Sequence, residues 1–109
     1  SFGGGIGRMR QTCGAACGMF LLAGLEKGAV DGKDREGKAA NYALVQELAE
    51  EFKKRNGSMI CAELLGLKKP EGSSTPEART EQYYAKRPCA KMVEEAATIW
   101  AEYLEKQQK

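Results

Sequence analysis

The stretch from Thr12 to Leu25 carries no charged residue, and this constrains the fold more than any other feature of the chain. Apolar and small residues recur in it at helical spacing, a pattern typical of a helix that is buried on nearly all sides. Gly14 and Gly18, one turn apart, are expected to let another backbone approach closely. It is too short to cross a bilayer, which takes about 20 apolar residues. We therefore expect it to be the central helix of a small all-α bundle.

The remaining elements are also predicted to be helical. An apolar stripe with charged residues around it indicates an amphipathic helix over 35–56, ended by Asn56-Gly57. Further helices are expected over 58–65 and from 88 to about 107, with one or two helical turns over 78–86. One side of the last helix is expected to face the core, and it carries Cys89, Met92, Val93, Ala96, Trp100 and Tyr103. A stretch rich in Pro, Gly, Ser and Lys predicts a loop over 66–77. These 109 residues fit a single helical domain.

Composition narrows the classes of protein to which the chain can belong. The net charge of +2 is too small to indicate nucleic-acid binding, and no apolar run is long enough for a membrane span. Secreted proteins that depend on disulfides are usually smaller and rich in loops, whereas this sequence is typical of helices. We therefore expect a reducing compartment, the cytoplasm, where thiols stay available for chemistry.

Four cysteines, Cys13, Cys17, Cys61 and Cys89, stand in a chain without histidine. Three of them lie where a helix is predicted to begin: Cys13 follows Thr12, a candidate N-cap, Cys61 comes shortly after Ser58, and Cys89 follows Pro88. The first turn of a helix carries unpaired N–H groups and positive potential, which favour the thiolate. These three helix starts are candidates for one shared site lined by sulfur.

Cys13 and Cys17 are one helical turn apart, so we expect both on one face with Cβ atoms about 5–6 Å apart. A disulfide needs about 3.5–4.5 Å, so a bridge within this helix would be strained and any disulfide should join different helices. Cys13 should be the most reactive thiol, since it lies at the helix start with Arg8 and Arg10 just upstream. Cys17 lies deeper, where burial disfavours its thiolate.

Several interpretations of these features remain open. Cysteine is often a small buried filler, and Cys17 is equally well explained in that way. All four cysteines could instead ligate an iron–sulfur cluster or another thiolate-bound metal; without histidine, a closed shell needs four sulfurs. A third hypothesis is a non-catalytic helical interaction module with buried thiols. The glycine run over 3–7 favours a tight turn over an anion site.

The arrangement of glycines and cysteines resembles the C_GCAxxG_C_C family, whose redox activity is itself inferred from its cysteine pattern. The resemblance runs from the first residue to the last helix. The family name implies a further cysteine upstream of the glycine run, so we expect an additional segment before Ser1. The residues that carry the resemblance are Phe2-Gly3-Gly4-Gly5-Ile6-Gly7, Thr12-Cys13-Gly14-Ala15 with Gly18, Cys61 with Leu64-Leu65-Gly66, and Cys89.

The resemblance implies a helical protein in which Cys13, Cys61 and Cys89 take part in thiol–disulfide or electron-transfer chemistry. Cys13 is the expected attacking thiolate, and a cysteine of another helix would resolve the intermediate. No family role transfers to Cys17, which stands at a variable position of the motif. We expect an unidentified redox partner, and also a homodimer, since the uncharged helix needs cover by a second subunit or by the upstream segment.

Overall fold

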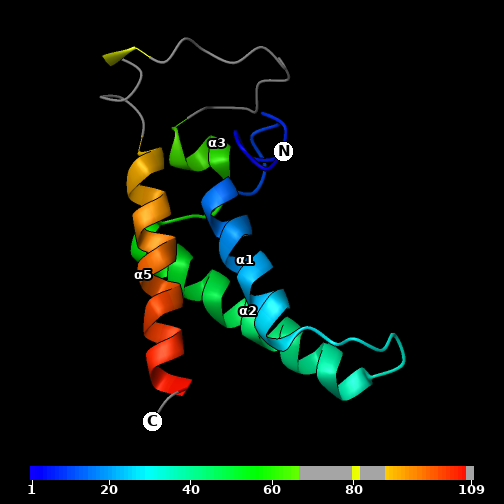
Figure 1. Ribbon diagram of the computed structural model, residues 1–109. Coiled ribbons are helices and arrows are strands. Elements are labelled where there is room, and N and C mark those ends of the chain that lie inside the picture. Colours follow the sequence, from blue (N-terminus) through cyan, green and yellow to red (C-terminus); the bar gives the residue numbers. More distant parts are fainter. Residues whose placement is uncertain (67–79, 82–87, 108–109) are drawn as a thin grey trace.

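A computed structural model describes residues 1–66, 80–81 and 88–107 (Figure 1). Within these ranges the chain forms four helices: α1 (Gly14–Lys27), α2 (Arg35–Asn56), α3 (Cys61–Leu64) and α5 (Cys89–Gln107). Helix α1 contacts both α2 and α5, which also contact each other. The predicted all-α bundle around an uncharged helix is therefore confirmed. The turns expected over 78–86 and most of the loop expected over 66–77 fall outside the described residues.

Helix α2 begins and ends where its sequence signals predict. The Asp34 carboxylate accepts a hydrogen bond from the Gly37 backbone N–H at 2.8 Å, which satisfies one donor of the first turn. Gly57 closes the helix in the left-handed conformation with φ 87°, a geometry that glycine adopts without steric cost.

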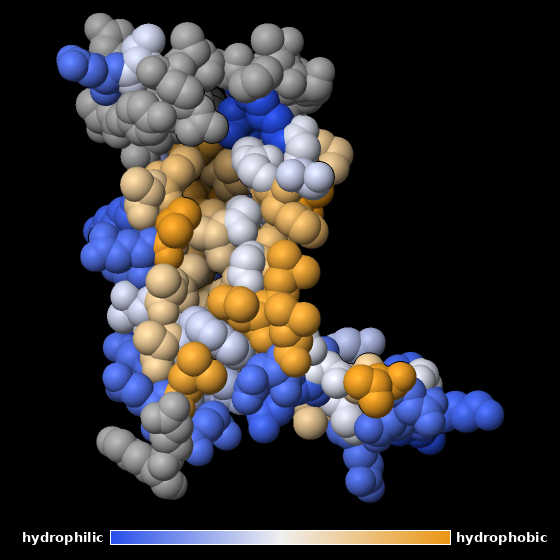
Figure 2. Space-filling view, in the orientation of Figure 1, coloured by the Kyte–Doolittle hydropathy of each residue, from blue (hydrophilic) through white to orange (hydrophobic). Residues whose placement is uncertain are grey.

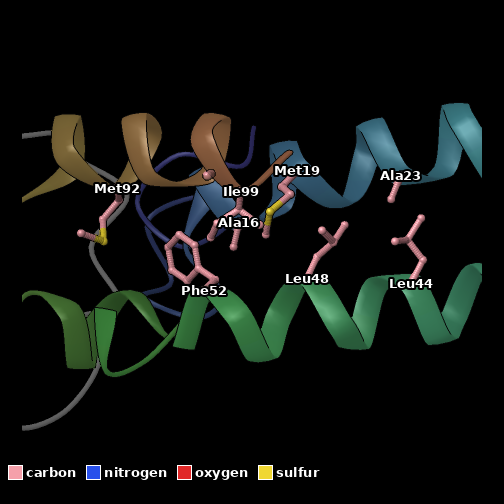
Figure 3. Close-up of a cluster of buried hydrophobic side chains, with 9 residues drawn as sticks. Ala16, Met19, Ala23, Leu44, Leu48, Phe52, Met92 and Ile99 are labelled. Carbon is pink, nitrogen blue, oxygen red and sulfur yellow. The ribbon is translucent and has the colours of Figure 1, made fainter. Parts of the chain in front are cut away.

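The core lies where α1, α2 and α5 meet (Figure 3). Of the stripe predicted for α2, Leu44, Leu48 and Phe52 are buried there and Val45 is partly buried. Met92 and Ala96 of α5 are also buried, whereas Val93 of the predicted α5 stripe is exposed. No helix in the described part of the chain is long and apolar enough to cross a membrane. The buried cluster consists of Ala16, Met19, Ala23, Leu44, Leu48, Phe52, Met92, Ala96 and Ile99.

Helix α1 is not buried on nearly all sides, so that prediction is wrong for the described residues. Its core side packs on α2 and α5, but Leu22 is 43 %, Leu21 53 % and Leu25 86 % exposed. The physical reason is that two neighbouring helices can cover only part of the circumference of a third. The expected covering by a second subunit or by an upstream segment stays a prediction.

The N-terminal residues form a left-handed turn that leads into α1. Five consecutive residues, Gly4 to Arg8, have φ between 56° and 72°, and Arg10 follows with φ 62°. L-amino acids with a side chain adopt this conformation at a cost of about 1–2 kcal/mol each, and Ile6, Arg8 and Arg10 all do so. Backbone hydrogen bonds close the turn, among them Gln11 N–H to Gly5 C=O at 2.9 Å.

This loop is joined to the start of α3 through the backbone. Thr12 and Ile60 form an isolated antiparallel bridge, flanked by hydrogen bonds from Cys13 N–H to Met59 C=O at 2.7 Å and from Cys61 N–H to Gln11 C=O at 2.5 Å. As a result α1 and α3 begin side by side. Figure 1 shows that α5 also begins at this end of the molecule.

Two predicted helix starts are wrong because of this pairing. Thr12 is not the N-cap of α1; Cys13 holds that position, since Thr12 is extended and paired with Ile60. The short helix starts at Cys61, not at Ser58, because the hydroxyl of Ser58 accepts the Ile60 N–H at 3.0 Å and the chain is still extended at Ile60.

The close approach predicted at Gly14 is confirmed, since a Cβ there would lie 2.7 Å from the Phe2 carbonyl oxygen.

The left-handed turn predicts unequal costs for two glycine substitutions. A Cβ on Gly5 would lie 2.5 Å from Cys61 Cβ, whereas a Cβ on Gly7 would meet nothing within 4 Å, although both residues have positive φ. Gly7→Ala should lower the free energy of unfolding by about 1–2 kcal/mol. Gly5→Ala should lower the free energy of unfolding by roughly 1–3 kcal/mol more, because its added methyl group overpacks the contact with Cys61. Urea denaturation of the two variants checks this; equal destabilisation would contradict the packing of the loop on Cys61.

Candidate functional site

A cavity of about 750 Å³ lies at the end of the bundle where α1, α3 and α5 begin. Its wall includes Cys13, Cys61 and Cys89, one cysteine from the start of each helix, together with the glycine loop and Arg10. The volume is within the range of about 300–1,000 Å³ that is typical of small-molecule sites. The structure thus brings together the three cysteines predicted to be catalytic. Their catalytic role stays a prediction.

Cys13 is the N-cap residue of α1 and is half-buried. Its backbone N–H is held by Met59 C=O, and its own carbonyl accepts the Cys17 N–H at 3.0 Å, which starts the helical hydrogen bonding. The N–H groups of the first helical turn after Cys13 have no acceptor within the helix. Negative charge on the Cys13 sulfur would therefore be stabilised by the amino end of α1.

Cys61 is 7 % exposed and lies against a buried arginine. The guanidinium of Arg10, itself 3 % exposed, places Nη1 3.6 Å from Cys61 Sγ. A hydrogen bond from a charged donor is stronger than one between two neutral groups. Gly5 packs directly on Cys61, where any larger residue would collide with the Cys61 Cβ.

Cys89 was expected to face the core, and that expectation is wrong. It is exposed, because the buried side of α5 is formed by Met92, Ala96 and Ile99. It still lines the cavity, as does Val93 one turn further along the helix. Cys89 is thus the most accessible of the three cysteines at the cavity.

Cys17 does not line the cavity, although it is one turn from Cys13. It is buried in α1, and burial raises the pKa of its thiol, with a further contribution in the same direction from Cys13. Cys13 and Cys17 are nevertheless close enough to interact electrostatically, as expected for residues one helical turn apart. Gly18, for which a close approach was predicted, has nothing near its Cα in the direction of a side chain.

The cysteines do not form a metal site in this arrangement. None of the four is in a disulfide. In the described part of the chain, no three Cys, Asp or Glu side chains lie close enough together to ligate one metal ion. The donor set does not fit a thiolate-bound metal or an iron–sulfur cluster, which needs about four converging sulfurs. Metal ligation by Cys13, Cys17, Cys61 and Cys89 stays a prediction.

Arg10 is the residue whose place at the site sequence reasoning missed. It was expected to add positive potential near Cys13, but its side chain contacts Cys61. The signal available in the sequence was an arginine within a glycine-rich stretch next to a cysteine motif. Nothing in that pattern indicates that the left-handed backbone at Arg10 turns the side chain inward.

The glycine loop, the Cys13 N-cap and the later cysteines occur in this order in a known family. The family described as "Putative redox-active protein (C_GCAxxG_C_C)" matches residues 1–103. The chain belongs to this family. No curated protein and no solved structure matches the chain significantly. Membership in the C_GCAxxG_C_C family agrees with the three cysteines at the cavity, and it does not test whether a segment precedes Ser1.

The environments of the thiols predict an order of alkylation. Because the pKa of Cys17 is raised, less of it is thiolate near neutral pH, and its burial also blocks reagent. Cys17 should therefore react more slowly than Cys13, and its rate should rise at higher pH than an ordinary thiol's. Mass spectrometry of reduced protein alkylated over a pH series measures both rates. Faster reaction of Cys17 than of Cys13 would contradict the burial of Cys17.

Cys13→Ser should lower the pKa of Cys17 toward its ordinary value, since a neighbouring thiolate is removed. The same alkylation measurement over a pH series checks this.

Proposed function

We propose that this protein is a dithiol–disulfide redox protein in which Cys13 and Cys61 form the reactive pair. The observation that carries the proposal is the shared cavity, which is lined by cysteines from three helix starts and by Arg10, whose guanidinium contacts Cys61. Buried arginine is rare unless it has an ionised partner, and Cys61 Sγ is within its reach. Membership in the C_GCAxxG_C_C family supports redox chemistry by these cysteines.

The bridge between Thr12 and Ile60 favours pairing of Cys13 with Cys61. Side chains alternate between the two faces of paired extended segments, so both cysteines lie on the face opposite Thr12 and Ile60. They are diagonal neighbours there, and such residues have Cα atoms about 7–8 Å apart in regular antiparallel strands. A disulfide spans roughly 4.4–6.8 Å between Cα atoms, so a small backbone shift suffices to form it.

The two cysteines differ in a way that assigns their roles. Cys13 is half-buried at a helix amino end and can be reached from the cavity, as an attacking thiolate must be. Cys61 is buried, which is acceptable for a resolving thiol because its target is Cys13. Arg10 holds and stabilises the Cys61 thiolate until that second step.

The reaction balances without any further group. Cys13 thiolate attacks a substrate disulfide, forming a mixed disulfide and releasing one substrate thiolate. Cys61 thiolate then attacks the Cys13 sulfur, so that a Cys13–Cys61 disulfide forms and the second substrate thiolate leaves. Two electrons pass from the protein to the substrate. Run backward with a dithiol substrate, the same steps reduce the protein.

Cys89 adds a third thiol at the surface of the same cavity. Attack of its thiolate on Cys13 would move the disulfide to Cys13–Cys89 and release Cys61 as thiolate. Because Cys89 is exposed, the disulfide would then be accessible to a redox partner. This exchange gives all three predicted catalytic cysteines a role and assigns none to Cys17.

Trapping of the mixed disulfide tests the proposal. In a Cys89→Ser background, which removes the exposed thiol, reduced protein is mixed with glutathione disulfide. Cys61→Ser should accumulate glutathione on Cys13, with a lifetime longer by on the order of tenfold or more, because intramolecular resolution is lost. Intact-mass and peptide mass spectrometry measure the adduct.

Cys17→Ala in the same background is the matched control, since it removes a cysteine that does not line the cavity. It should release glutathione as fast as the Cys89→Ser protein. Equal adduct lifetimes in Cys61→Ser and Cys17→Ala would show that Cys61 does not resolve the intermediate.

A further inference from the structure

The cavity changes in chemical character along its length. The end near the helix starts carries the three thiols and Arg10 among backbone of the glycine loop. The other end lies between α1 and α5, and its wall is formed by aliphatic side chains: Leu21 and Leu22 of α1 and Val93, Ala96 and Ala97 of α5. Figure 2 shows apolar residues gathered on this face of the two helices. A ligand that fits both ends has a polar reactive head and an aliphatic tail.

The aliphatic wall of the cavity is long enough to hold an alkyl chain of a ligand. Helices α1 and α5 both begin at the sulfur end and extend away from it (Figure 1). From Cys13 to Leu22, and likewise from Cys89 to Ala97, the wall runs about 12–14 Å at the rise of 1.5 Å per helical residue. Leu21 and Val93 remain more than half exposed, so apolar area is available for a ligand to cover.

We propose that the substrate of this site is a small two-electron acceptor carried on an aliphatic chain, with a quinone or disulfide head at the cysteines. This inference rests on the proposed dithiol function and adds its substrate class. The tail lies along Leu21, Leu22 and Val93, and a head-group oxygen or sulfur accepts a hydrogen bond from the Arg10 guanidinium, which forms part of the cavity wall. A compact hydrophilic disulfide would leave the aliphatic wall uncovered.

Electrons and protons balance for either head group. Cys13 and Cys61 lose two electrons and two protons and form a disulfide. A quinone takes up both and becomes the hydroquinone, whereas a disulfide is cleaved to two thiols. In both cases negative charge develops on the head group before it is protonated, and the guanidinium of Arg10 stabilises that charge.

Two series of acceptors test the substrate class and distinguish the two heads. One series consists of fully substituted benzoquinones, to which thiols cannot add, bearing a methyl, pentyl or decyl chain. The other consists of mixed disulfides of 2-mercaptoethanol with the matching alkyl thiols. For the correct head, kcat/KM for oxidation of the reduced protein should rise with chain length, by up to about fourfold for each CH₂ group that becomes fully buried.

Leu21→Ser should flatten this dependence on chain length, because it removes apolar side-chain area along which the tail lies. Leu25→Ser is the matched control, because Leu25 is on the same helix, is 86 % exposed and does not line the cavity. It should keep the full dependence. Both substitutions introduce the same residue on the outside of α1, so loss of helix propensity affects them equally.

The outcomes separate this inference from the proposed function. A chain-length dependence in one series supports the inference and identifies the head group. No dependence in either series, or an equal loss in Leu21→Ser and Leu25→Ser, overturns it, while the trapping of glutathione on Cys13 still supports dithiol chemistry. If Cys61→Ser also fails to trap glutathione, the proposed function is wrong as well.

Discussion

The left-handed turn of residues 4–8 is the constraint on which the site depends. It brings the chain back so that Arg10 and Gln11 accept the N–H groups at the start of α3, and this pairing places α1 and α3 side by side. Without the turn, Cys13 and Cys61 would belong to unconnected helix ends. Three residues with side chains adopt positive φ here, which costs a few kcal/mol in total, by an estimate of about 1–2 kcal/mol each. Strain of this kind is typically found at functional sites.

The same turn explains why a cation is buried beside a thiol. Arg10 has positive φ and a side chain that is almost entirely buried, and its guanidinium reaches Cys61 Sγ. Removing an ionised group from water is unfavourable unless charge or hydrogen bonds compensate it. The contact between Arg10 and Cys61 therefore joins the packing of the N-terminal loop to the start of α3.

The sequence predicted the helices well and the site only in part. The uncharged stretch before Leu25, the stripe of α2 and the cap at Gly57 are local signals, and the structure agrees with them. The start of α1 and the contact of Arg10 with Cys61 depend on pairing between segments about fifty residues apart, which local sequence patterns do not show. The exposure of Cys89 depends on which side of α5 packs on the other helices. The prediction that α1 is buried on nearly all sides failed for a related reason: apolar composition does not determine how many helices pack against a given helix.

Mapping the disulfide in mildly oxidised protein tests the central claim most directly. The backbone pairing of Thr12 with Ile60 holds Cys13 and Cys61 on one face of the bridge, so they should form the dominant disulfide. Proteolysis without reduction, followed by mass spectrometry, identifies the linked peptides. We expect Cys13 joined to Cys61 and Cys17 recovered as a free thiol. A dominant Cys13–Cys17 bridge would require the first turn of α1 to unwind, and it would contradict the arrangement of the site.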